Sequence, residues 1–275
     1  MKLATVRGDN GPRVGRVDGD RIALLAGTSD VGRLLVDEGS WRERVAEADG
    51  TVIAFEDADL APVVIDPPKI ICLGLNYRSH ILEMGRELPQ YPTLFPKYSR
   101  SLIGPRDNIM LPSVSDQVDW EAELAFVIGE SVRDVTVDGA RRAIAGYTVL
   151  NDVSMRDWQW RTTEWLQGKT FERSTPVGPY LVTPDEVGDA DDLLLKCLVD
   201  GEVMQEGRTS DLLFKPAEVV SYISQFITLE PGDLISTGTP GGVGAARDPQ
   251  LFLKPGQVVT TSIEGLGDLV NTCVG

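Results

Sequence analysis

Residues 119–129 of the chain, DWEAELAFVIG, decide the fold. In a β-strand, successive side chains point to opposite faces of the sheet. One face of this strand carries Trp120, Ala122, Leu124 and Phe126, and the other carries Glu121, Glu123, Ala125 and Val127. Since the face with the two glutamates continues into apolar residues, we expect their carboxylates to be partly buried.

The paired glutamates of this strand predict a cation site. Residues i and i+2 of a strand lie about 6–7 Å apart, so both carboxylates can reach one cation. Two buried carboxylates this close repel each other and lose hydration unless a cation or a shared proton compensates them. An ordinary strand with Glu121 and Glu123 facing water explains this segment alone at least as well, so other segments must decide.

Outward from this strand, most of residues 67–275 predicts further strands. These strands lie within residues 69–77, 124–129, 146–152, 178–183, 193–204 and 253–273. A hairpin turn is expected at Asp200 and Gly201. Only residues 138–145 and 216–226 predict helices, and Pro216 opens the second. Because strands dominate and do not alternate regularly with helices, we expect an α+β, mostly β domain rather than a doubly wound sheet.

Residues 1–66 predict a small N-terminal α+β domain. Alternating apolar and polar residues around Asp18 and Gly19 indicate short strands and a tight turn. Ser29 and Asp30 can cap a helical stretch over residues 31–48. Two prolines follow Asp66 and cannot continue a helix or a central strand, so the second domain is expected to span residues 67–275.

The composition predicts a packed globular protein with an acidic surface. The 275 residues carry 26 basic and 42 acidic side chains, a formal net charge of −16. Such a chain repels nucleic acid and anionic membranes, so neither is expected as a partner. No apolar run approaches about 18 residues and the N-terminus does not resemble a signal peptide, which predicts a cytoplasmic protein. The three distant cysteines favour neither a disulfide framework nor a zinc site.

A second predicted strand supplies a third carboxylate. Residues 146–152, GYTVLND, end in Asn151 and Asp152. A carboxylate just past a strand end is well placed to line a cleft. With Glu121 and Glu123 it would form an all-oxygen site, which suits Mg²⁺ or Mn²⁺ rather than zinc.

His80, the only histidine, lies three residues before Glu83 in NYRSHILEMG, residues 76–85. In a short helix capped by Ser79 and ended by Gly85, both side chains share one face. A carboxylate beside an imidazole orients the ring and raises its basicity, as in a general base that acts on water. A surface histidine with an incidental ion pair is the alternative, and the residues alone favour it.

Two lysines and a glycine-rich turn are candidates for binding an anion. Lys97 and Lys169 could each neutralise a substrate carboxylate or an enolate, although a single lysine is usually a solvated surface charge. Residues 235–244, ISTGTPGGVG, could bind a carboxylate through backbone N–H groups. This turn lacks the P-loop pattern and no clear helix follows it, so a nucleotide site is not expected.

Taken together, these segments resemble the fumarylacetoacetate hydrolase family. The resemblance runs from about residue 69 to the C-terminus and rests on motifs in the family's order and spacing. They are GLNYRSHILEMG, FPKYSRSLIGP, VDWEAELAFVIG, GYTVLNDVSMRDWQ, LQGKTFERSTPVGPYLVT and ISTGTPGGVG. The resemblance implies a mixed β-sandwich roll with the small extra N-terminal domain of many bacterial members, and a homodimer.

The resemblance also implies roles for individual residues. Glu121, Glu123 and Asp152 match the family's ligands for one Mg²⁺ or Mn²⁺ per subunit. His80, Glu83 and Lys169 match its catalytic residues, and Arg156, Gln159 and Thr239 match positions in contact with substrate. Lys97 is a fourth predicted substrate contact.

Two features narrow this prediction. The metabolic fumarylacetoacetate enzymes have a further acidic ligand seven residues before the histidine, where this chain has Leu73, so the chain resembles the acylpyruvase-like branch. Trp158, Trp160 and Trp165 lie within eight residues. They either pack under a loop or at a dimer interface, or they bind a bulky apolar substrate tail.

The implied activity is hydrolysis of a carbon–carbon bond in a 2,4-dioxo acid of the acylpyruvate or fumarylpyruvate type. The metal would act as a Lewis acid, His80 oriented by Glu83 would activate water, and Lys169 would stabilise negative charge. The same enolate chemistry serves a 2-oxo acid decarboxylase of the oxaloacetate type, and isomerases or hydratases of dienoates from aromatic degradation. A binding protein without chemistry is disfavoured, because every motif position holds a competent residue.

Overall fold

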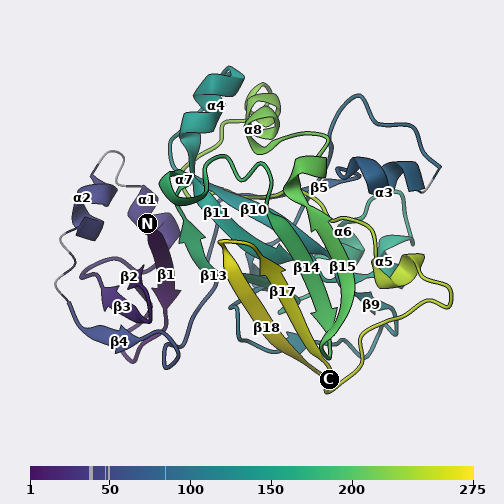
Figure 1. The fold of residues 1–275 in the computed structure, drawn as a ribbon, viewed down its shortest axis with the longest axis horizontal. Coiled ribbons are helices and arrows are strands. Elements are labelled where there is room, and N and C mark those ends of the chain that lie inside the picture. The colour runs from purple at the N-terminus through teal and green to yellow at the C-terminus, as the bar shows by residue number, and fades with distance from the viewer. Residues whose placement is uncertain (37–39, 47, 49, 84) are drawn as a thin grey trace.

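A large and a smaller β-sheet are the main layers of the protein (Figure 1). The computed structural model describes all residues except 37–39, 47, 49 and 84. In spatial order the large sheet contains β4 (Val52–Ala54), β3 (Arg21–Leu24), β2 (Arg13–Asp18), β1 (Lys2–Val6), β13 (Thr175–Val182), β11 (Ile144–Asn151), β10 (Ala122–Ile128), β16 (Leu234–Ser236), β5 (Ile70–Gly74) and β6 (Thr93–Pro96), and β7 (Leu102–Ile103) pairs with β13. The smaller sheet contains β15 (Glu202–Arg208), β14 (Leu194–Val199), β17 (Val258–Ile263), β18 (Gly267–Val274) and β8 (Ile109–Met110).

The remaining elements are short. The strands β9 (Val118–Asp119) and β12 (Ser154–Met155) pair with each other. The α-helices are α1 (Val31–Leu35), α2 (Trp41–Ala46), α3 (Arg78–Glu83), α4 (Val137–Ala143), α5 (Arg156–Gln159), α6 (Leu166–Lys169), α7 (Pro184–Val187) and α8 (Pro216–Ser224). Three further turns of 3-10 helix span Ser99–Ser101, Thr209–Asp211 and Gly244–Ala246. No helix among the described residues is long and apolar enough to cross a membrane. Large sheets with only short helices confirm the prediction of an α+β, mostly β fold.

Strand β10 lies in the middle of the large sheet, between β11 and β16, and all of its residues are buried. Leu124 and Phe126 pack in a cluster that includes apolar residues of the smaller sheet. Ala125 and Val127 face a second cluster, which includes the apolar residues of α1. The predicted division of this strand between two faces is thus correct. Each face of the strand packs against a hydrophobic cluster, so neither face is exposed to water.

The N-terminal region contributes strands to the same large sheet. Strand β1 pairs with β2 on one side and with β13 on the other, with Lys2 opposite Val182. Backbone hydrogen bonds therefore join residues 1–66 to the rest of the chain. Asp30 caps α1 by accepting from the Arg33 N–H group. The stretch predicted as helical over residues 31–48 contains α1 and α2, and residues 37–39 and 47 of it lie outside the described residues.

Two local predictions differ in their outcome. Asp200 and Gly201 form the expected turn between β14 and β15, with φ angles of 51° and 84°. The helix predicted for residues 138–145 ends earlier, at Ala143, because Ile144 already pairs with Ile128 of β10. A β-branched residue fits the sheet better than a helix end, so long-range pairing overrides the local pattern.

Candidate active site

The register of two central strands brings the three predicted carboxylates together. Ala122 of β10 lies opposite Asn151 of β11, so Asp152 follows directly beside Glu121, and its N–H group donates to the Glu121 carbonyl at 2.8 Å. One oxygen from each of Glu121, Glu123 and Asp152 lies within 4.8 Å of the other two. All three side chains are buried. The alternative of glutamates that face water is therefore wrong.

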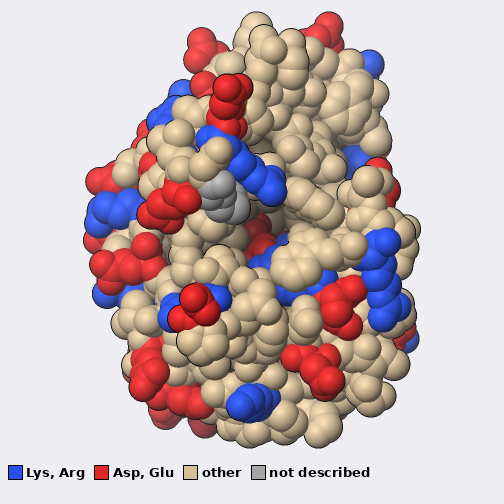
Figure 2. All heavy atoms as spheres, turned by 90° about the vertical axis from the view of Figure 1, so that its right-hand side faces the viewer, with Lys and Arg blue, Asp and Glu red and all other residues tan. Residues whose placement is uncertain are grey.

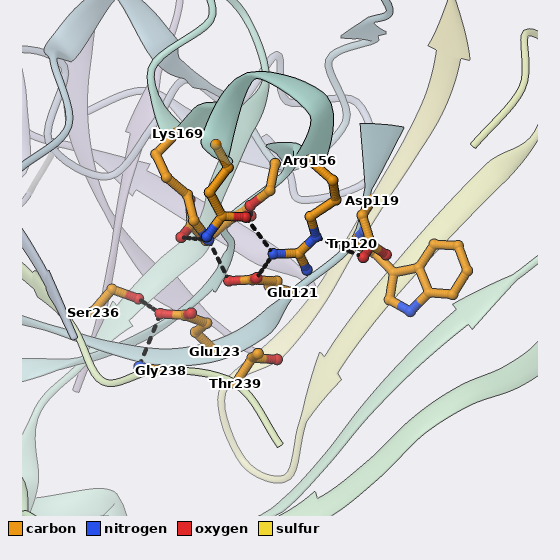
Figure 3. A network of polar contacts seen from close by, with 12 residues as sticks. Asp119, Trp120, Glu121, Glu123, Arg156, Lys169, Ser236, Gly238 and Thr239 are labelled. Carbon is orange, nitrogen blue, oxygen red and sulfur yellow. Dashed lines mark hydrogen bonds and ion pairs between the residues drawn. The ribbon is translucent and has the colours of Figure 1, made fainter. Parts of the chain in front are cut away.

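Glu123 has an incomplete set of partners. Its Oε2 accepts a short hydrogen bond from the Ser236 hydroxyl and a 3.0 Å bond from the Gly238 N–H group (Figure 3). Its Oε1 is buried and has no hydrogen-bond partner among the described residues. Burial, together with the nearby charges of Asp152 and Glu121, raises the pKa of Glu123 well above its ordinary value. A buried carboxylate oxygen without a partner fits a metal ligand, because a bound cation would compensate it.

Two lysines lie against the same carboxylates. The Lys169 ammonium is 2.7 Å from Glu121 Oε2 and 2.9 Å from Asp152 Oδ2 (Figure 3). The Lys97 ammonium is 2.5 Å from Asp152 Oδ1. Burial opposes ionisation of Asp152, but the two ammonium groups outweigh it and hold the pKa of Asp152 below its ordinary value. Burial likewise opposes the charge of Lys169, and the carboxylates of Asp152 and Glu121 nevertheless raise its pKa.

Arg156 links the carboxylate cluster to Asp119. Its Nε donates to Asp119 Oδ2 at 2.8 Å, and its Nη1 lies 2.6 Å from Glu121 Oε1 and 2.8 Å from Gln159 Oε1. Its Nη2 is buried and has no hydrogen-bond partner among the described residues. Asp119 also accepts from the N–H groups of Gly244 and Ala245, at 2.7 and 2.9 Å.

Asp119 was missed by sequence reasoning, although it stands in the decisive segment. Asp119, Glu121 and Glu123 are spaced two residues apart, which predicts one common face. That spacing was the available signal. Asp119 differs from Glu121 and Glu123 in its contacts. It accepts hydrogen bonds from Arg156 and from Gly244, the last residue of the glycine-rich turn of residues 235–244.

A cavity of about 400 Å³ lies over this cluster. Seven predicted site residues line it, namely His80, Glu121, Glu123, Arg156, Gln159, Lys169 and Thr239. Asp152 and Lys97 do not line the cavity, and both are buried. The Thr239 hydroxyl donates to the Ala122 carbonyl and accepts from Gln205. Figure 2, which views the molecule from the right-hand side of Figure 1, shows a hollow with acidic and basic atoms inside it.

His80 and Glu83 lie on α3 and face the glycine-rich turn. A Cβ atom added to Gly241 would lie 3.1 Å from Glu83 Oε2 and 3.3 Å from His80 Nδ1. Both side chains therefore approach one point of the turn, as their predicted i, i+3 spacing requires. Burial lowers the pKa of His80, and the Glu83 carboxylate partly opposes this. The imidazole is therefore mainly neutral at pH 7, the form that can accept a proton.

The charges of the cluster fit a divalent cation. Four carboxylates (Asp119, Glu121, Glu123 and Asp152) face the cationic side chains of Lys97, Lys169 and Arg156, which leaves one uncompensated negative charge when all are ionised. The donors are all oxygens, which Mg²⁺ and Mn²⁺ prefer. A bound divalent cation would make the cluster net positive, and such a cluster attracts an anionic substrate in an acidic protein.

Comparison with known proteins agrees with this geometry. The family profile described as "Fumarylacetoacetate (FAA) hydrolase C-terminal" matches residues 69–274. The chain belongs to this family. One relative is "Oxaloacetate tautomerase FAHD2A, mitochondrial" of Bos taurus. It is 47% identical over 217 residues, which cover 78% of this chain and 69% of that protein.

Solved structures of the fumarylacetoacetate hydrolase family superpose on the whole chain. A putative HpcE protein from Mycobacterium smegmatis is 33% identical with a TM-score of 0.91, and covers 100% of this chain and 99% of its own. A 5-carboxymethyl-2-hydroxymuconate delta-isomerase from the same organism is 32% identical with a TM-score of 0.82 and the same coverage. A maleylpyruvate hydrolase from Sphingobium is 30% identical with a TM-score of 0.84, again over 100% and 99%. The resemblance inferred from the motifs is confirmed, and the protein is an enzyme of this family.

Proposed function

We propose that the protein is a divalent-metal-dependent tautomerase that interconverts the keto and enol forms of a small 2-oxo acid of the oxaloacetate type. The choice of reaction rests on the 47% identity with an oxaloacetate tautomerase over 78% of the chain. It corrects the emphasis of the sequence-based prediction, which put hydrolysis first and isomerisation among the alternatives. The cavity supports the proposed reaction, because a histidine and buried charged residues line it together.

The reaction needs only proton transfer. One proton leaves C3 of the acid and one joins the oxygen on C2, so no bond between heavier atoms breaks and no water is consumed. His80, kept mainly neutral by burial, takes the C3 proton on an imidazole nitrogen. The Lys169 ammonium and the Nη2 of Arg156 stabilise the negative charge that develops on the substrate, and this Nη2 has no hydrogen-bond partner within the described part of the chain.

The carboxylates supply the metal site. Glu121, Glu123 and Asp152 would hold Mg²⁺ or Mn²⁺, which would supply Lewis-acid stabilisation of negative charge at the 2-oxo group. Arg156 and Lys169 orient Glu121. Lys97 and Lys169 orient Asp152. These two ligands are therefore held in place before a metal binds. Gln159 and Thr239 line the cavity and would orient the acid.

The test uses enol oxaloacetate with Mg²⁺, with Mn²⁺ and after chelation. We expect metal-dependent decay of the enol absorbance above the spontaneous rate, without matching release of CO₂ or pyruvate. Stoichiometric CO₂ would favour the decarboxylase alternative. Full activity after thorough chelation, or no acceleration with either metal, would contradict the proposal.

Hydrolysis of a 2,4-dioxo acid is the second candidate. It is favoured by the approach of His80 and Glu83 to one point of the glycine-rich turn, a pairing suited to water activation. The similarity to a maleylpyruvate hydrolase points the same way. An acylpyruvate assayed for pyruvate release distinguishes it, since a tautomerase alone forms no pyruvate.

Three further properties are proposed on the family resemblance and the composition. These are a homodimer, a cytoplasmic location, and a small oxo acid as the partner rather than nucleic acid or membrane. Sedimentation would test the first, and fractionation of the native cells the second.

A further inference from the structure

We infer that the cavity binds an aromatic group on C3 of its 2-oxo acid, so that the substrate class is the 3-aryl 2-oxo acids, with Trp160 and Trp165 as the residues that determine this specificity. The inference rests on the proposed function and names the substrate of the same site. Sequence reasoning left open whether these tryptophans pack structurally or contact a substrate.

The lining of the cavity includes both charged and apolar residues, called here its charged part and its apolar part. The charged part is the cluster around Glu121, Lys169 and Arg156. The apolar part is lined by Leu73, Phe95, Trp160, Trp165 and Val243. A ligand that fills the cavity must therefore combine an anionic head with an apolar tail.

Phe95 and Trp165 form a fixed wall that begins at the catalytic ammonium. The Lys169 nitrogen lies 5.2 Å from the centre of the Phe95 ring, and that ring meets the Trp165 indole edge to face at 5.6 Å. The indole lies directly on the backbone of β5, because a Cβ atom on Gly74 would come within 2.2 Å of it. The wall thus places aromatic residues of the lining next to the Lys169 ammonium.

Trp160 is the other tryptophan that lines the cavity. It follows Gln159 at the end of α5, lines the cavity and leaves 57% of its surface exposed. No ring or cation–π contact among the described residues involves it. A large exposed indole beside a binding cavity gains by covering a ligand ring, since aromatic pairs are favourable beyond the area they bury.

Trp158 shows the contrast within the same segment. Its indole packs edge to face on Phe171, carries the Arg161 guanidinium over its ring, and donates to the Val114 carbonyl at 3.1 Å. It does not line the cavity. The structural explanation of the tryptophan cluster thus suits Trp158, and the substrate explanation suits the other two.

The size of the cavity and the reaction both fit an aryl acid. Pockets of about 300–1,000 Å³ bury drug-sized ligands, so a four-carbon acid leaves much of this cavity unfilled. An aryl group on C3 acidifies the C3 hydrogen and conjugates with the enol. The step is unchanged, since the C3 proton moves to His80 and a proton joins the oxygen on C2.

The test compares phenylpyruvate with oxaloacetate as substrates of the Mg²⁺-loaded enzyme and of two variants. We expect the ratio of kcat/KM for phenylpyruvate to that for oxaloacetate to fall roughly tenfold in Trp160→Ala. In the matched control Trp158→Ala, checked for folding by its melting temperature, the ratio should stay within about twofold. Turnover of oxaloacetate without turnover of phenylpyruvate, or an equal ratio in Trp160→Ala, would overturn the inference.

A calorimetric titration with phenylpyruvate separates this inference from the proposed function. If no acid is turned over but phenylpyruvate binds and Trp160→Ala weakens that binding, the tautomerase proposal fails and the aryl site stands. If phenylpyruvate neither binds nor reacts while enol oxaloacetate does, the tautomerase proposal stands and the aryl site fails.

Discussion

The Lys97 ammonium lies 2.5 Å from Asp152 Oδ1, and neither side chain has any exposed surface. Lys97 contacts one carboxylate oxygen of Asp152, and Lys169 contacts the other. Lys97 thus contacts a predicted metal ligand, and it does not line the cavity. Its predicted contact with substrate stays a prediction. The geometry makes Lys97 a positioning residue for Asp152.

Replacing Lys97 by Met should make the protein depend more on metal for its stability. Loss of one partner from a buried ion pair destabilises a protein by up to about 3–5 kcal/mol, and Asp152 would keep only Lys169 as a cationic partner among the described residues. A bound divalent cation supplies part of the missing positive charge. We therefore expect a lower melting temperature in chelator, and a larger rise on adding Mg²⁺ or Mn²⁺ than the unaltered protein shows.

Lys69→Met is the matched control for this experiment. Lys69 pairs with the buried Asp233 at 2.9 Å, outside the carboxylate cluster. This variant should lose stability while its metal-induced rise matches that of the unaltered protein. Equal metal-induced rises in both variants would show that Lys97 does not act on the metal site.

Replacing Glu123 by Gln should stabilise the metal-free protein while abolishing metal-dependent activity. The amide can keep the hydrogen bonds from Ser236 and Gly238 without a buried charge. We expect a gain on the order of 1 kcal/mol in chelator. Because the folded-state pKa of Glu123 is raised above the unfolded value of about 4.3, its carboxylate is destabilising only above that pH. The gain should therefore vanish near pH 4 and grow as the pH rises above the unfolded value.

Glu121→Gln should change the stability of the metal-free protein in the opposite direction. Glu121 has two cationic partners, Arg156 and Lys169, so the loss of its charge breaks two buried ion pairs. This variant should lose about 3 kcal/mol in chelator. Chemical denaturation of both variants measures the difference, and a loss of stability in Glu123→Gln would contradict the description of Glu123 as an uncompensated ligand.

The carboxylate cluster was predictable because its signal is local. Alternation along residues 119–129 placed Glu121 and Glu123 on one face, and the end of a neighbouring strand supplied Asp152. Sequence alone could not decide whether that face meets water, since its burial depends on residues far away in the sequence, such as those of α1. The family motifs, rather than periodicity, decided between the alternatives for these residues.

The features that escaped prediction depend on long-range contacts. The partners of Asp119 lie 37 residues away at Arg156 and 125 residues away at Gly244. The pairing of β1 with β13, which joins the N-terminal region to the large sheet, spans a still larger separation. The early end of α4 has the same cause, because Ile144 is drawn into β11 by its partner on β10. No local pattern encodes such register.

The acid limb of the pH–rate profile should lie below pH 6.5. Burial lowers the pKa of His80 from that ordinary value, so the imidazole loses its proton at lower pH and the base form predominates at neutral pH. Since the Glu83 carboxylate raises this pKa, Glu83→Gln should move the limb to still lower pH. Glu87→Gln, an exposed residue outside the cavity, should leave it in place. A limb above pH 7, or one unmoved by Glu83→Gln, would exclude His80 as the titrating base.

Replacing Gly168 by Ala should lower kcat/KM by roughly 100-fold while the protein still folds. A Cβ atom at Gly168 would lie 2.5 Å from the backbone nitrogen of Gln159, so α6 must move away from α5. These two helices carry Lys169 and Arg156, whose contacts with Glu121 are 2.7 and 2.6 Å long. A displacement of about 1 Å at a catalytic group is enough for a loss of this size. Gly139→Ala in α4 is the control, because its nearest contact of 3.4 Å is ordinary packing, and it should keep full activity. Full activity in Gly168→Ala would mean that the contact of α6 with α5 does not position Lys169.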